Sequence, residues 1–172
     1  MTQSASLSVL VGKDFACVKI TGRANFTFSP DFKALLTGLI QKGYKHFLID
    51  LSECLLMDST FLGTLAGFGL MTNPNAPTHS DIELYNPSAR VAELLENLGV
   101  IELFKVINGP MHLPGECSAA RTEQSEHSRE EITRTCLEAH KALMAANPQN
   151  VVRFKDVTQF LAEDLKNLQK SS

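Results

Sequence analysis

Apolar and polar positions along the first part of the chain predict two strands, a helix and a third strand. The β-prone runs 7–11 and 15–20 flank a turn-like tripeptide and indicate an antiparallel hairpin. Ser29-Pro30 supplies an N-cap and a proline at the first helical position, and apolar residues recur at helical spacing behind it, up to a stop near Gly43. The run 46–51 is almost wholly apolar, as is typical of a strand buried on both faces.

The same pattern continues to about residue 107. The elements that it predicts are, in order, a loop at 52–57, a glycine-containing helix from Ser59, a loop at 73–78, a strand at 81–85, a helix at 90–98 and a strand at 103–107. The order β-β-α-β-α-β-α-β implies one mixed sheet with helices packed against it. We therefore expect an α/β fold with about four to five strands.

The last part of the chain reads differently. Residues 108–127 are rich in Gly, Pro, Ser and charge and indicate a linker or a long ordered loop. Ser128 to Glu131 has the pattern of a capping box that opens an amphipathic helix, and Asn147-Pro148 begins a second one. We expect a domain at 1–107, a linker at 108–127 and a two-helix extension at 128–172. The apolar stripe of the extension should dock on the domain itself; a homodimer is the competing outcome.

Composition limits the class of protein. Of the 172 residues 44% are apolar and 20% are charged, and the formal net charge is -3, which fits a globular protein and does not favour nucleic-acid binding. The four cysteines form no CxxC pair, and the first residues lack the pattern of a signal peptide. The longest apolar run is too short for a membrane span, which needs about 20 residues. We expect a cytoplasmic protein that binds no membrane.

No pattern in the sequence identifies an enzyme or a metal site. The five histidines show no spacing that marks a catalytic base, so a hydrolase that uses Ser59 or a cysteine is disfavoured. Cys136 and His140 are four residues apart on a predicted helix, but two ligands do not make a metal site. The glycines from Gly63 to Gly69 lack the ending of a phosphate loop and favour close helix packing. We expect a protein without catalytic residues, metal or cofactor.

The pair Asp58-Ser59 stands between two hydrophobic runs. Asp58 is placed to cap the helix that starts at Ser59. A hydroxyl in the first turn of a helix should lie near the surface and be open to modification, and a phosphate there would be costly to bury against a partner. The apolar neighbours of this pair cannot all face the sheet, so some should form an exposed rim of the kind that marks a partner surface; they are Leu55, Leu56, Met57, Phe61 and Leu62.

Residues 6–107 resemble the STAS domain, a family named for sulfate transporters and anti-sigma factor antagonists. The resemblance rests on Gly22 after the second strand, on the stretch LIDLSECLLMDS, and on Asp58-Ser59-Thr60 followed by Gly63. The family motif runs Asp-Ser-Ser/Thr-Gly-x-Gly, and its first serine is phosphorylated, which carries over to Ser59. The chain departs from the motif at Phe61, which stands in the place of the first glycine, and at Asn25, where the family usually has Asp.

The resemblance implies a STAS-like mixed sheet and a non-enzymatic regulator that switches partners. The unphosphorylated protein would bind an anti-sigma factor that is a serine kinase, phosphorylation of Ser59 would end this binding, and a serine phosphatase would restore it. ATP and metals would belong to the partners. The expected partner-binding residues are Asn25, Met57, Asp58, Ser59, Thr60, Phe61 and Leu62. The alternative is a STAS scaffold that is not phosphorylated and serves ligand sensing or oligomerisation.

Overall fold

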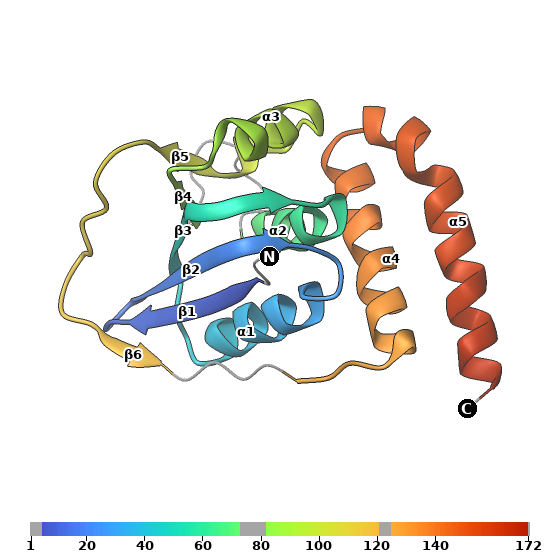
Figure 1. The fold of residues 1–172 in the computed structure, drawn as a ribbon, viewed down its shortest axis with the longest axis horizontal. Helices are drawn as coiled ribbons and strands as arrows, with labels where there is room; N and C mark the ends of the chain where they lie inside the picture. The colour runs from blue at the N-terminus through green and yellow to red at the C-terminus, as the bar shows by residue number, and fades with distance from the viewer. Residues whose placement is uncertain (1–4, 73–81, 121–124, 172) are drawn as a thin grey trace.

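The protein is described by a computed structural model that covers residues 5–72, 82–120 and 125–171 (Figure 1). Its elements are, along the chain, β1 (Ser6–Val11), β2 (Phe15–Ala24), α1 (Ser29–Gln41), β3 (His46–Met57), α2 (Ser59–Thr72), β4 (Ile82–Tyr85), α3 (Ala89–Asn97), the 3-10 helix η1 (Ile101–Leu103), β5 (Lys105–Ile107), β6 (Ser118–Ala120), α4 (Arg129–Ala146) and α5 (Gln149–Lys170). The predicted loop at 73–78 lies outside the described residues.

The strands form one sheet in the order β5-β4-β3-β2-β1-β6. β1 and β2 are antiparallel, with Ser6 opposite Thr21 and Val11 opposite Ala16, whereas β2, β3, β4 and β5 run parallel. The predicted hairpin and the predicted mixed sheet are therefore confirmed. The described part of the sheet has six strands, and the additional one comes from a segment in which the sequence predicted none.

The main core lies between one face of this sheet and the helices α1, α2 and α3. Alternate residues of the central strands belong to it, among them Val18 and Ile20 of β2 and Ile49 of β3, and all three are fully buried. Phe32 of α1 and Leu95 of α3 reach the same cluster from the helix side. Helices and sheet therefore form two layers, and the starts of the helices lie at one rim of the sheet.

The opposite face of the sheet carries a smaller core that is covered by irregular chain. This cluster consists of Phe15, Cys17, Leu48 and Tyr85. Met111, Leu113 and Cys117 pack against it, after which β6 pairs with the edge strand β1. Burial raises the pKa of the Cys17 thiol to about 11, so this cysteine behaves as an apolar core residue.

Three local predictions are wrong. Residues 52–57, predicted as a loop, continue β3, because they stay paired with β2 across two register shifts as far as the pair Ala24–Met57. Ser29 is the first residue of α1 and not its N-cap; its hydroxyl donates to the carbonyl oxygen of Asn25. The predicted strand at 103–107 begins only at Lys105, because η1 takes up its first residue.

The C-terminal segment forms a helical hairpin in which α4 lies against α2 and α5 lies against α4 (Figure 1). The Ser128 side chain accepts a hydrogen bond from the Glu131 N–H at 3.1 Å, which confirms the predicted cap of α4. Gly99, with φ +65, ends α3 and lies so close to Asn147 that a Cβ there would meet the Asn147 Nδ2 at 1.9 Å. The hairpin thus docks on the domain's own helices, as the sequence predicted.

Candidate functional site: the start of α2

Two parallel strands end together where α2 begins. Ala24 at the end of β2 lies opposite Met57 at the end of β3, and the N–H of Asp58 donates to the Ala24 carbonyl at 3.0 Å. The chain then turns directly into α2, with Ser59 as its first residue. The sheet therefore fixes the position of Asp58 and Ser59 at its rim.

Asp58 caps α2 and also holds the loop that follows β2. One carboxylate oxygen accepts from the Phe61 N–H at 2.8 Å, and the other accepts from the Phe26 N–H at 2.6 Å. Burial raises the pKa of this carboxyl, although its bonds to the backbone of Phe61 and Phe26 act in the opposite direction. The predicted cap is confirmed, and the same side chain joins two segments that are distant in sequence.

Ser59 is joined to a histidine of the C-terminal extension. The Ser59 Oγ lies 3.1 Å from Nε2 of His140, and the other ring nitrogen, Nδ1, lies 2.7 Å from the Cys136 carbonyl oxygen. A carbonyl only accepts, so Nδ1 must carry a proton; in the neutral ring Nε2 is then the acceptor, and the Ser59 hydroxyl donates to it. Next to this pair the Thr60 hydroxyl donates to the Cys136 Sγ at 3.7 Å.

Glycines on α2 allow α4 to lie close behind this pair. A Cβ at Gly63 would meet the backbone carbonyl oxygen of Ala139 at 2.4 Å, whereas a Cβ at Gly67 would meet only the Ala142 Cβ, at 3.6 Å. The close-packing role predicted for these glycines is thus seen at Gly63. As a result α4 lies on the face of α2 that carries Ser59.

The structure places the predicted partner-binding residues in two environments. Asn25, Asp58 and Ser59 are half-buried at the rim, while Met57, Thr60, Phe61 and Leu62 are buried. The Phe61 ring stacks on Phe32 of α1 with centroids 4.4 Å apart, so it lies in the main core and away from the surface. Of the predicted apolar rim, Leu55 is exposed, at 51%, whereas Met57, Phe61 and Leu62 are buried; Phe26, which was not predicted, is 47% exposed.

His140 is the residue at this site that sequence reasoning did not assign to Ser59. Its four-residue spacing from Cys136 was visible as a single helix face, but the sequence could not show which surface that face meets. Phe154 of α5 supports the His140 ring from behind in an edge-on contact, with centroids 4.9 Å apart. Ser59, His140 and Phe154 therefore connect α2, α4 and α5.

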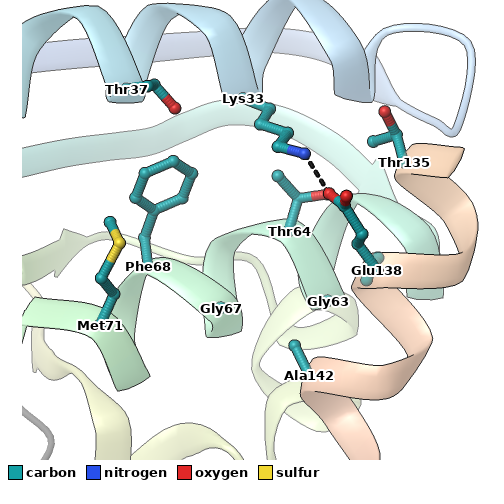
Figure 2. Close-up of a pocket in the computed structure, with 11 residues that line it drawn as sticks. Lys33, Thr37, Gly63, Thr64, Gly67, Phe68, Met71, Thr135, Glu138 and Ala142 are labelled. Atoms are coloured by element: carbon teal, nitrogen blue, oxygen red, sulfur yellow. Dashed lines mark hydrogen bonds and ion pairs between the residues drawn. The ribbon is translucent and has the colours of Figure 1, made fainter. Parts of the chain in front are cut away.

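An apolar groove lies beside this contact, between α1, α2 and α4 (Figure 2). It has a volume of about 240 Å³, and Gly63, Gly67 and Phe68 of α2 form part of its lining. At one end the Lys33 ammonium of α1 pairs with the Glu138 carboxylate of α4. The Lys33–Glu138 pair thus joins α1 to α4 beside the groove.

The Ser59–His140 contact has one element of nucleophilic catalysis. A serine that donates to a histidine Nε2 is the start of a catalytic pair. The histidine is oriented by a backbone carbonyl, however, and neither Ser59 nor His140 lines the groove. Within residues 5–72, 82–120 and 125–171 no group of three or more His, Cys, Asp or Glu side chains could hold a metal ion. The pair serves to join α4 to α2.

The hairpin is held at its other end by a buried asparagine. Asn150, at the start of α5, is 1% exposed, and its amide nitrogen donates to the carbonyl oxygens of Leu98 and Leu143, both at 2.8 Å. One bond reaches the end of α3 and the other reaches α4. A single side chain thus satisfies two buried carbonyls and fixes the turn between α4 and α5 to the domain.

A histidine before α4 attaches the start of the hairpin to Asp31 of α1. His127 Nε2 lies 2.7 Å from the Asp31 carboxylate and Nδ1 lies 2.9 Å from that of Glu131. Burial lowers the pKa of His127, but the bonds to Asp31 and Glu131 outweigh it, so the pKa is raised above 6.5. A raised histidine pKa gives stability that is complete below the unfolded value and is lost as the pH rises through the folded one.

We therefore expect His127→Gln to cost more stability at about pH 6 than at about pH 9. Urea unfolding of both proteins at the two pH values measures this difference. The matched control is His112→Gln, because His112 is exposed; it should leave the stability and its pH dependence unchanged. An equal cost of His127→Gln at both pH values would show that the charge of His127 does not hold the hairpin.

In the described part of the chain no helix combines the length and the apolar character that crossing a bilayer requires.

Comparison with known proteins identifies the family of the chain. No curated protein matches the chain. Among solved structures, the anti-sigma factor antagonist SpoIIAA in its unphosphorylated form is similar, with 17% sequence identity and a TM-score of 0.48; the match covers 60% of this chain and 88% of that one. The family model of the STAS domain matches residues 7–111. The chain therefore belongs to the STAS domain family and carries a C-terminal helical extension.

Proposed function

We propose that this protein is a non-enzymatic partner-switching regulator of the anti-sigma factor antagonist type. In its unphosphorylated form it binds an anti-sigma factor that is a serine kinase, phosphorylation of Ser59 ends this binding, and a serine phosphatase restores it. The observation that supports this most is the placement of Ser59, directly after the capping Asp58 and as the first residue of α2, in a chain of the STAS family. Such partners also place the protein in the cytoplasm.

The electrostatics at the start of α2 suit a switch. A phosphate adds about -1.5 to -2 charges, which the helix N-terminus favours and the Asp58 carboxylate opposes. The exposed rim residues Phe26 and Leu55 adjoin this end of the domain and offer apolar surface to a partner. Burying a phosphate against that surface would be costly, so one modification is enough to end an interaction.

The first prediction is that incubation with the cognate kinase and ATP places phosphate on Ser59. Mass spectrometry of the digested protein locates it, and Ser59→Ala should abolish the label while Thr60→Ala should retain it. Ser59→Asp should weaken the affinity for the kinase at least tenfold, or about 1.4 kcal/mol. Label on another residue, or an unchanged affinity of Ser59→Asp, would refute the proposal.

A second candidate is a STAS scaffold that is not phosphorylated and acts in ligand sensing or oligomerisation. The observation that favours it is the Ser59 hydroxyl, which is already bonded to His140 beneath α4. The groove at Lys33 is the place for a small apolar ligand, and α5 exposes apolar side chains for a second copy: Val151, Val152, Val157 and Phe160. Sedimentation of the full chain distinguishes the candidates, because a monomer that carries phosphate on Ser59 would exclude the scaffold.

A further inference from the structure

We infer that α4 is an internal partner of the Ser59 surface: docked α4 and a phosphate on Ser59 exclude one another, so phosphorylation releases the C-terminal hairpin. This inference rests on the proposed function in taking Ser59 as the modified residue. The inference adds to that function a regulatory role for residues 129–170, which lie outside the matched STAS domain at 7–111.

The first argument is the space between the two helices. The Ser59 Oγ and the His140 Nε2 are 3.1 Å apart, so a phosphorus atom and three further oxygens have no room between them. The neighbouring residues are also in contact, because the Thr60 hydroxyl lies 3.7 Å from the Cys136 Sγ. With the Ser59 side chain in this orientation, a phosphate on it therefore requires that this part of α4 move away.

The second argument is that α4 cannot slide along α2 to make this room. Gly63 lies against the backbone of Ala139, and any side chain there would overlap it. At the far end the Asn150 amide is fixed between the carbonyl oxygens of Leu98 and Leu143. Contacts on both sides of His140 along α4 thus fix the register, and the conflict with a phosphate is resolved by separation of α4 from α2.

The third argument concerns the chemistry of the contact. The Cys136 carbonyl requires a proton on Nδ1 of His140, so in the neutral ring the nitrogen that faces Ser59 is an acceptor. A hydroxyl satisfies it by donating, whereas a dianionic phosphate has no hydrogen to donate. The Asp58 carboxylate, which is fixed by its bonds to Phe26 and Phe61, adds negative charge beside the same position. Phosphorylation thus removes the hydrogen that the neutral ring accepts and adds negative charge beside Asp58.

Docked α4 should in turn slow the phosphorylation of Ser59. A kinase can reach Ser59 only in the fraction of molecules in which α4 is away from α2, so docking lowers the apparent rate of phosphorylation by that fraction. Partner binding at the same face is weakened for the same reason, and by linkage the partner weakens the docking of α4 to an equal extent. The hairpin thus competes with the external partner for the Ser59 surface.

The test uses the full chain with phosphoserine incorporated at position 59, so that no kinase is needed. Hydrogen exchange followed by mass spectrometry compares it with the unmodified chain. We expect amides of α4 to exchange at least tenfold faster in the phosphorylated chain, while those of β2 and β3 stay unchanged. Unchanged or slower exchange in α4 would overturn the inference, and slower exchange would mean that His140 captures the phosphate.

A variant opens the same contact without touching Ser59. Gly63→Ala places a methyl group against the Ala139 carbonyl, whereas Gly67→Ala makes only an ordinary contact at 3.6 Å, and the two share the same gain in helix propensity. Gly63→Ala should speed exchange in α4 at least tenfold and Gly67→Ala should not. Equal behaviour of the two variants would contradict the close docking of α4.

The two proposals can fail separately. If phosphoserine at position 59 leaves α4 docked, the inference fails, while the kinase assay still decides the proposed function. If phosphoserine releases α4 but the cognate kinase labels neither the full chain nor Gly63→Ala at Ser59, the exclusion stands as a property of the molecule and the proposed function fails.

Discussion

Replacing Phe61 with alanine should lower the free energy of unfolding by about 3–5 kcal/mol. The Phe61 side chain is fully buried in the main core and stacks on Phe32, so its removal deletes apolar contacts of two helices and leaves a cavity. Because a domain is stable by only about 5–15 kcal/mol, this is a large share of the total. Urea unfolding followed by circular dichroism measures it.

The matched control is Phe160→Ala, the same substitution at a position of α5 that is 68% exposed. It should change the free energy of unfolding by no more than about 0.5 kcal/mol. If Phe61→Ala behaved like this control, the Phe61 side chain would not be part of the core. The expectation from the sequence that Phe61 lies at the partner surface would then hold.

Replacing Leu143 with alanine should weaken the docking of the C-terminal hairpin by about 2–5 kcal/mol. Leu143 of α4 is 0% exposed, and its side chain belongs to the main core. In proteins most helical stability comes from packing of the amphipathic face, so the loss should appear as faster hydrogen exchange throughout α4 and α5. Amides of β2 and β3 should keep their protection.

The control for Leu143→Ala is Leu55→Ala, at a position that is 51% exposed. It should leave exchange in the hairpin unchanged. A different result for Leu143→Ala, in which sheet and hairpin lose protection together, would mean that the hairpin and the domain unfold as one cooperative unit. Release of α4 alone would then be too costly to serve as a switch.

The position of Phe61 changes the meaning of the chain's departure from the STAS motif. The motif has a glycine there, and a large side chain next to Ser59 would obstruct a partner if it pointed outward. In the structure it points into the core, onto Phe32. The side chains that limit access to Ser59 are those of α4, with His140 in direct contact.

Much of the fold was predictable because it follows from local periodicity. The hairpin of β1 and β2, the helix from Ser59 and the capped helix after Ser128 each have a repeat of two or about 3.6 residues and a terminal signal. The strand at 52–57 was missed because Ser52 and Glu53 break the apolar pattern; only pairing with β2 shows that this stretch is extended. β6 was missed because three residues among prolines and glycines give no period.

The candidate site was predictable only in part. A carboxylate followed by a hydroxyl at the start of a helix has a local physical meaning, so the role of Asp58 as a cap could be read from the residues. Which apolar neighbours face solvent could not, because each lies on a strand or helix whose orientation depends on distant partners. Leu55 is exposed as predicted, but Met57, predicted at the rim, is buried, and Phe26, for which nothing was predicted, is exposed.

By itself the sequence determined the α/β order of elements, the place of Asp58 and Ser59 at the start of a helix, and an apolar stripe that the C-terminal helices had to bury. Only the tertiary structure decided that α4 lies on α2, with His140 against Ser59 at 3.1 Å. The reason is physical: periodicity and capping act over a few residues, whereas this contact joins residues 81 positions apart and depends on shape, through the space that Gly63 leaves for Ala139.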